Sequence, residues 1–169
     1  MIIMEVWDAY FADGSLADIE LFRGGAIPEG LYHLVSDILV RHVDGDYLLM
    51  QRDYKKPNFG GYFDASAGGS ALKGEDEVAC AERELYEETG ILAETLERVG
   101  RYTSANTIYY QFLCTTDCDK SSISLKKGET ISYKWVSEKA FIEFIDSDKM
   151  IPPKRVRYYE YFKRMGYIK

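Results

Sequence analysis

The sequence predicts an α/β fold: one domain, residues 1–169, with helices packed against a mixed β-sheet. Three observations lead to this prediction. Short apolar runs separated by Asp-Gly pairs fill the N-terminal part, one strongly helical segment follows, and further strand-like and helical segments complete the chain. A chain of 169 residues is long enough to bury the core of one ordinary domain.

An N-terminal β-hairpin extension is predicted for about residues 4–23. Two mixed apolar runs in this segment flank Asp13-Gly14. Both residues tolerate a positive φ, which makes the pair a typical hairpin turn. Residues 24–31 then connect the hairpin to the rest of the chain. We expect the hairpin to be exposed, where it could serve a homodimer.

Two strands are predicted next, over residues 32–43 and 46–52, joined at Asp44-Gly45 as a second hairpin or a tight strand pair. Residues 55–61 (KKPNFGG) form a loop, and residues 62–67 (YFDASA) form a short strand that leads to Gly68 and Gly69.

Residues 75–89 are predicted to form a helix. Ala, Glu, Leu and Arg dominate the segment, and Gly90 stands where a C-terminal cap belongs. At about 100° per residue, Val78, Ala81 and Leu85 fall on one arc, which would pack on the sheet. The arc beside it carries three glutamates: Glu84, Glu87 and Glu88.

The second half of the chain predicts three strands followed by two helices. The strands cover residues 98–104, 108–116 and 131–137, and the helices lie near 137–146 and 153–165. Residues 126–129 (KKGE) form the loop that enters the last strand.

Composition excludes several classes of protein. A net charge of −7 argues against nucleic acid or an anionic membrane surface as the main partner. No apolar run approaches the roughly 20 residues that cross a bilayer, and no signal peptide is apparent, so we expect a cytoplasmic protein. Three cysteines cannot all pair within the chain. Cys114 and Cys118 are interpreted as reduced thiols, and Cys80 as a small packing residue of the helix.

The glutamates of the helix form the most informative motif. From Gly69 the chain reads Gly, five residues, Glu75, seven residues, and then RELYEETGI. This segment, residues 69–91, is similar at every specified position to G-x5-E-x7-R-E-U-x-E-E-x-G-U, where U is bulky and apolar. It therefore resembles the Nudix box, the signature of the Nudix hydrolase family.

The chemistry of the residues agrees with this resemblance. Like charges at helical spacing repel, but carboxylates at i, i+3 and i+4 also form an oxygen-rich site for a hard divalent cation. We expect Mg²⁺, with Mn²⁺ as an alternative, bound by Glu84, Glu87 and Glu88. The cation would neutralise a diphosphate and lower the pKa of the attacking water. The same three glutamates are the candidate catalytic residues, and which of them is the general base stays open.

The resemblance implies more than the residues alone do. It implies an α/β/α sandwich and hydrolysis of a nucleoside diphosphate linked to another group, X. It also implies an ion pair between Glu75 and Arg83, a metal contact from the Gly68 carbonyl, and structural roles for Gly69 and Gly90. Glu129, in the loop outside the box, would be a further metal ligand or the base, with a charged turn as the equal alternative.

A wider likeness extends to the isopentenyl-diphosphate isomerase-like branch of the family. It rests on EVWDAYFADG, RGGAIPEGLYHLV and LLMQRDYKKPNFGGYFDASAGG. Gly60 and Phe63 depart from the branch pattern, which often has Pro and Trp there. A true isomerase needs a cysteine just before its box, whereas FDASAGG has Ser66 there. An isomerase is therefore the less favoured alternative, as is a module that senses nucleotides without cleaving them.

For several residues, the sequence supports both a functional and a structural interpretation. Arg52, Lys55 and Lys56 precede the box as phosphate-binding residues do in this branch, or belong to a solvated turn. His33 is more simply a structural histidine than a substrate contact. Aromatic residues that could stack on a base are more often core: Tyr62, Phe63, Tyr109 and Tyr110. The identity of X stays open among nucleoside triphosphates, ADP-ribose, dinucleotides, and isoprenoid or sugar diphosphates.

Overall fold

A computed structural model describes residues 3–169. The strands are β1 (Val6–Tyr10), β2 (Leu16–Phe22), β3 (His33–His42), β4 (Tyr47–Arg52), β5 (Phe63–Ala65), β6 (Ala67–Ser70), β7 (Leu96–Ser104), β8 (Thr107–Thr116) and β9 (Thr130–Val136). The helices are α1 (Glu77–Thr89), α2 (Glu138–Ile145), α3 (Pro152–Arg157) and α4 (Tyr159–Arg164).

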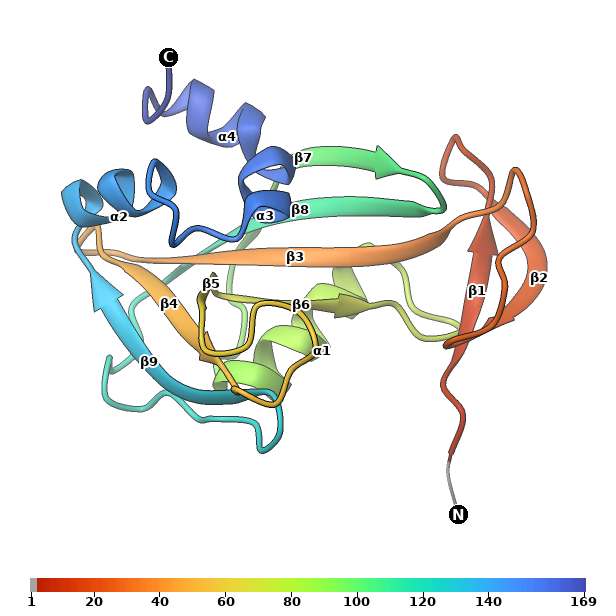
Figure 1. The fold of residues 1–169 in the computed structure, drawn as a ribbon, viewed down its shortest axis with the longest axis horizontal. Coiled ribbons are helices and arrows are strands. Elements are labelled where there is room, and N and C mark those ends of the chain that lie inside the picture. The colour runs from red at the N-terminus through yellow and green to blue at the C-terminus, as the bar shows by residue number, and fades with distance from the viewer. Residues whose placement is uncertain (1–2) are drawn as a thin grey trace.

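Seven of these strands form one mixed sheet. The path β5-β4-β3-β8-β7 forms its body, β6 pairs with β3, and β9 pairs with β4. The pairing of β3 with β8 is parallel, and the other pairings are antiparallel. Helix α1 covers one face, and α2, α3 and α4 cover the other (Figure 1). The predicted α/β fold with a mixed sheet is confirmed.

Each face of the sheet has its own apolar core. On the α1 side, Ile38, Leu48 and Phe112 pack with Leu85 of the helix. On the other side, a core rich in aromatic residues joins the sheet to the C-terminal helices; its largest buried side chains include Tyr47, Phe141, Tyr158, Tyr161 and Phe162. The helices on both faces are therefore held by buried apolar area, the dominant favourable contribution to folding.

Strands β3 and β4 diverge soon after the turn that joins them. The turn at Asp44-Gly45 is present as predicted, but the two strands pair only at Arg41 and Tyr47. Beyond that point β5 pairs with β4 and β6 pairs with β3, so residues 62–67 do not form the single predicted strand. The break is at Ser66, whose φ is 67°.

The side chain of Ser66 bonds to both β3 and β4 at the point where the two strands separate. Its hydroxyl donates to the carbonyl of Leu48 on β4 at 2.8 Å and accepts from the amide of Val40 on β3 at 2.9 Å. One buried hydroxyl thus satisfies a backbone group on each strand where the strands no longer satisfy each other. The separation of β3 and β4 places a cavity inside the sheet.

Helix α1 begins at Glu77, two residues later than predicted, because Asp76 is its N-cap and accepts a hydrogen bond from the amide of Ala79. Its C-cap is Gly90, whose φ of 78° lies in the left-handed region that glycine tolerates. The prediction that Val78 lies on the buried arc is wrong. That side chain is exposed, because the buried face is centred on Cys80 and on Glu84 with their neighbours Ala81 and Leu85.

The C-terminal segment forms two helices where one was predicted over residues 153–165. Helices α3 and α4 meet at Tyr158, which has a φ of −91° and a ψ of 9°. The Tyr158 hydroxyl donates to the carbonyl of Phe112 on β8 at 3.0 Å. This residue is fully buried, so its contact with the sheet fixes the point where the helix direction changes.

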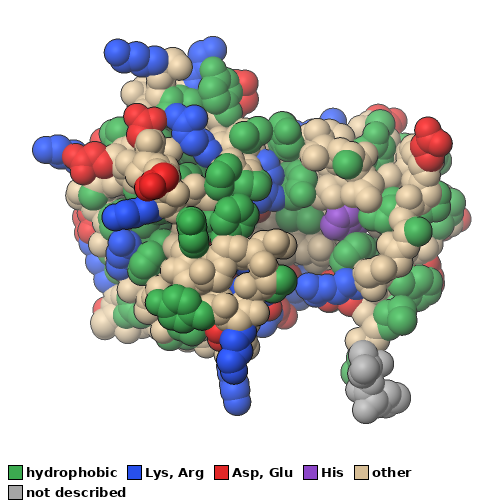
Figure 2. Space-filling view, viewed as in Figure 1, with side chains coloured by type: hydrophobic (Ala, Val, Ile, Leu, Met, Phe, Trp, Pro, Cys, Tyr) green, Lys and Arg blue, Asp and Glu red, His purple; other side chains and the backbone are tan. Residues whose placement is uncertain are grey.

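The N-terminal hairpin is confirmed as a separate two-stranded sheet of β1 and β2. It joins the body of the molecule through a bridge between Tyr10 and Tyr32, and the Trp7 ring stacks on His33 at 4.4 Å. Hydrophobic side chains appear on the outer surface of the hairpin, at the right of Figure 2. Within residues 3–169, no helix is long and apolar enough to cross a membrane.

Candidate active site

A cavity of about 470 Å³ lies where β3 and β4 separate. Strands β3 and β6 form one wall, β4 and β5 another, and residues from α1 and α3 reach it from opposite faces of the sheet. Its acidic lining includes Glu84, Glu87, Glu88 and Glu129. Its basic lining includes Arg52, Lys56, Lys126, Lys154 and Arg157.

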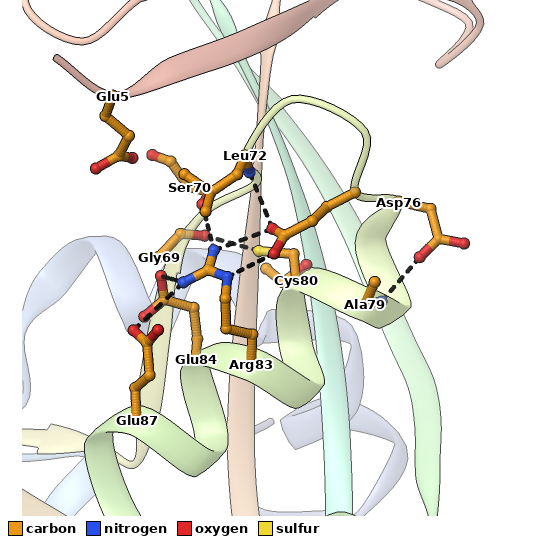
Figure 3. Close-up of polar contacts among 12 residues, drawn as sticks. Glu5, Gly69, Ser70, Leu72, Asp76, Ala79, Cys80, Arg83, Glu84 and Glu87 are labelled. Carbon is orange, nitrogen blue, oxygen red and sulfur yellow. Dashed lines mark hydrogen bonds and ion pairs between the residues drawn. The ribbon is translucent and has the colours of Figure 1, made fainter. Parts of the chain in front are cut away.

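Arg83 occupies the centre of the acidic end (Figure 3). Its Nε donates to Glu75 Oε1 at 2.5 Å, and its Nη2 donates to Glu75 Oε2 at 3.0 Å. The same Nη2 donates to the carbonyl of Ser70 at 3.0 Å, and Nη1 donates to Glu84 Oε1 at 2.9 Å. The expected contact between Glu75 and Arg83 is present. These hydrogen bonds raise the pKa of Arg83 and tie the loop after β6 to the helix.

Gly69 lies directly against the carboxylate of Glu84. A Cβ at Gly69 would overlap both carboxylate oxygens of that side chain. Glu84 is largely buried, and its position depends on Arg83 on one side and on the bare glycine backbone on the other. The absence of a Cβ at position 69 therefore permits this close approach, and Gly69 helps to position an acidic group of the cavity.

Glu88 lies next to Glu84 on the same face of α1 and also lines the cavity. Burial and the nearby charge of Glu84 raise the pKa of Glu88 well above its usual value. Two carboxylates this close disfavour each other's charge unless a proton or a cation compensates. This pair of carboxylates is therefore suited to binding a cation.

Glu87 points elsewhere. It is exposed, and its Oε2 lies 3.4 Å from Arg83 Nη1 and 3.3 Å from Lys126 Nζ. Among the residues that the structure describes, no group of three or more acidic, histidine or cysteine side chains is already arranged to hold a metal ion. The three box glutamates share one end of the cavity, where Glu84 pairs with Arg83 and Glu87 pairs with Arg83 and Lys126.

The available donors fit a hard divalent cation. Carboxylate and carbonyl oxygens are the ligands that Mg²⁺ and Mn²⁺ prefer. Gly68, whose carbonyl was the expected backbone ligand, also lines the cavity. The residues that would hold the cation are Gly68, Glu84, Glu87 and Glu88.

The predicted residues outside the box are only partly brought together. Lys56 and Glu129 line the cavity and form an ion pair, and Arg52 lines it while bonding to the Asn58 carbonyl at 3.1 Å. Lys55 is exposed and outside the lining, because Lys55 and Lys56 are adjacent in a turn and only Lys56 extends toward Glu129. Strand β9, which follows Glu129, pairs with β4, and β4 pairs with β5 on its other edge.

Several cavity residues were not predicted from the sequence. They are Glu5 and Arg23 from the N-terminal hairpin region, Asp37 from β3, Asp64 from β5, and Lys154 and Arg157 from α3. These positions lie far apart in the chain, and no local spacing connects them. A lysine between two prolines and an arginine, in IPPKRVRYY, reads as the polar face of a helix.

The other candidates lie outside the cavity. Cys80 is fully buried and donates its S–H to the Gly69 carbonyl at 3.4 Å; burial raises its pKa to about 12. His33 contacts Thr107 and stacks on Trp7, in a structural setting. The described cavity lining contains none of the four aromatic residues considered above. The cysteines Cys80, Cys114 and Cys118 are free.

Comparisons with known proteins agree with this geometry. A family model described as the NUDIX domain matches residues 31–162. An uncharacterized Nudix hydrolase of Listeria monocytogenes is 31% identical over 152 residues, covering 88% of this chain and 89% of its own.

Two solved structures are similar in fold. A crystal structure from Deinococcus radiodurans has a TM-score of 0.68 at 15% identity, covering 85% of this chain and 90% of its own. A MutT protein from Methanosarcina mazei has a TM-score of 0.61 at 25% identity, covering 80% and 95%. The chain therefore belongs to the Nudix hydrolase family, whose members are generally pyrophosphohydrolases and typically use divalent metals.

Proposed function

We propose that this protein is a Mg²⁺-dependent hydrolase that cleaves the diphosphate bond of a nucleoside diphosphate linked to X, or of a related organic diphosphate. One observation carries the proposal: the complete set of box glutamates lines one end of a cavity that also presents lysine and arginine side chains. A diphosphate needs cations around its oxygens, and a metal ion at the glutamates would supply the remaining charge.

The chain's own residues would divide the work as follows. Glu84, Glu87 and Glu88, with the Gly68 carbonyl, would hold the cation. Bound there, a divalent metal supplies charge neutralisation and a more acidic water. Arg52, Lys56 and Lys126 would bind phosphate oxygens once the substrate competes for their present partners. A carboxylate of the cavity would accept the proton of the attacking water.

Phosphate release tests the proposal directly. We expect release from at least one member of a panel of nucleoside and organic diphosphates with Mg²⁺ or Mn²⁺, and none after EDTA. Activity that survives EDTA, or no release from any member of the panel, contradicts it. If no member of the panel releases phosphate, the alternative of a nucleotide-sensing module is favoured. Retention of every box glutamate argues against that alternative.

The wider sequence likeness supports membership of the isopentenyl-diphosphate isomerase-like branch of the family. Isomerisation of isopentenyl diphosphate is nevertheless not expected. The chemistry needs a cysteine that can exchange a proton with an alkene. Cys80 is fully buried outside the cavity, and its high pKa keeps the thiol protonated at neutral pH. NMR detection of the dimethylallyl product checks this, and turnover at ordinary enzyme rates would contradict it.

Glu129 is proposed as a further active-site carboxylate. Its side chain lines the cavity and pairs with Lys56, which supports a role beyond that of a surface turn. We expect Glu129→Gln to lower kcat by roughly 10²-fold if it is the base, with little change in melting temperature because the side chain is partly exposed. Lys127→Gln, in the same loop but outside the cavity lining, is the control. Unchanged kcat and metal dependence in Glu129→Gln would return this residue to the surface.

A further inference from the structure

A second group of charges lies in the cavity, outside the Nudix box. Lys154 Nζ of α3 donates to Asp37 Oδ1 of β3 at 2.6 Å, and Arg157 Nη1 lies 3.5 Å from Asp37 Oδ2. The side chains of Lys154, Asp37 and Arg157 are 7%, 2% and 14% exposed, respectively. Two cations therefore share the Asp37 carboxylate in a nearly buried place, with Asp64 as a second carboxylate near Lys154.

Such a group is a poor way to stabilise a fold. Removing charges from water costs several kcal/mol per ion, and apolar residues of similar volume often serve as well or better. A need for charge at this place explains the cluster better than stability does.

The cations have hydrogen-bonding capacity to spare. An ammonium group carries three hydrogen-bond donors. Within residues 3–169, Lys154 Nζ makes one hydrogen bond, which is to Asp37. The next carboxylate, Asp64, is 3.9 Å away. Arg157 stacks over the Tyr109 ring at 4.2 Å and makes a long hydrogen bond, 3.3 Å, to the carbonyl of Pro153. Both residues line the cavity, so their remaining donors can meet a ligand there.

The apolar lining offers little to a hydrocarbon or a stacked ring. Val35, Met50 and Leu72 are its apolar side chains, and the described lining includes no aromatic residue. A buried prenyl chain needs continuous apolar area, and a nucleobase gains from an aromatic face. The chemistry of this end of the cavity matches oxygen atoms that accept hydrogen bonds.

We propose that Lys154 and Arg157, held in place by Asp37, form a subsite for an oxygen-rich group of the substrate. The inference deepens the proposed function and rests on it: X would be a sugar or a phosphorylated sugar, in preference to a hydrocarbon. Asp37 is the positioning residue of this subsite, because it orients both cations and does not itself accept the oxygens of the ligand.

Binding of three small phosphates tests the subsite without relying on catalysis. They are n-pentyl phosphate, ribose 5-phosphate and ribose 1,5-bisphosphate, each titrated by calorimetry in the presence of Mg²⁺. We expect the Kd of ribose 5-phosphate to be about tenfold lower than that of n-pentyl phosphate, as a few hydrogen bonds to charged donors provide. Tighter binding of the bisphosphate than of ribose 5-phosphate would identify a phosphate, rather than hydroxyl groups, as the occupant.

Variants assign the preference to the cluster. Lys154→Met is expected to bring the Kd values of ribose 5-phosphate and n-pentyl phosphate within about twofold of each other. Because this change leaves Asp37 with one cation, the double variant Asp37→Asn/Lys154→Met provides a charge-balanced version with the same expected loss. Lys154→Arg should restore part of the preference. Arg155→Met, on the same helix but paired with Asp146 and outside this cavity, should leave it unchanged.

Two results would overturn the inference: equal Kd values for the sugar and pentyl phosphates in the unmodified protein, or the same loss of affinity for both in the Lys154 variants. The second would show that Lys154 binds the phosphate common to all ligands or acts on the fold. A sugar preference that depends on Lys154, in a protein that hydrolyses no diphosphate, would support the subsite while rejecting the proposed function.

Discussion

Glu88→Gln is expected to lower kcat by at least about 10²-fold, because it removes a charged ligand and candidate base from the cavity. The substitution keeps the size of the side chain. In the metal-free protein, the neutral amide would also relieve the repulsion with Glu84, whose proximity adds to the effect of burial in raising the Glu88 pKa. The melting temperature without metal should therefore stay the same or rise, while the increase that Mg²⁺ produces should shrink.

The matched control for this prediction is Glu82→Gln, on the exposed face of the same helix and outside the cavity. It should leave kcat and the Mg²⁺-induced rise in melting temperature unchanged. Full activity in Glu88→Gln, measured as phosphate release at saturating substrate and metal, would remove Glu88 from the site. Equal losses in both variants would indicate a general effect of lowering the negative charge of α1.

Gly69→Ala is expected to lower the affinity for Mg²⁺ or Mn²⁺ by about 10- to 100-fold, the usual effect of disturbing a residue that orients a metal ligand. The added Cβ would overlap the carboxylate of Glu84. Since that carboxylate is the end of a flexible side chain, it can move away at small cost to the fold. The change should thus separate metal binding from stability, with the loss appearing in a metal titration and little change in melting temperature.

Gly25→Ala is the control for this substitution. A Cβ at Gly25 would also make a tight contact, 3.1 Å from the carbonyl oxygen of Phe22. This contact involves residues that are distant in sequence from the box glutamates. Its metal affinity should equal that of the unmodified protein. A large loss of stability in Gly69→Ala, with metal affinity retained, would mean that Gly69 serves the backbone path and not the position of Glu84.

Local patterns predicted much of the fold and part of the site. Asp-Gly turns and the composition of residues 75–89 identified the hairpin and helix α1, because these signals act within a few residues. Box spacing identified the glutamates because one helix carries them. The split at Ser66 and the break at Tyr158 depend on contacts with distant strands, which no local pattern reveals.

The cavity residues from α3 were missed for the same reason. Lys154 and Asp37 are separated by 117 positions, and the hydrogen bond between them exists only because the C-terminal segment covers the sheet. Lys55 and Lys56 were both candidates because their loop precedes the box, but the cavity lining includes Lys56 and not Lys55. Adjacent side chains in a turn point in different directions, so only one of them reaches the cavity.

The separation of β3 and β4 at Ser66 also bears on how such an enzyme could acquire new substrates. Because the opening passes through the sheet, the glutamates approach it from one helical layer and Lys154 from the other. Under the proposed function, substitutions in the C-terminal segment could therefore accumulate and change which molecule is accepted while the Nudix box stays intact. In this architecture, reactivity and selectivity can be inherited separately.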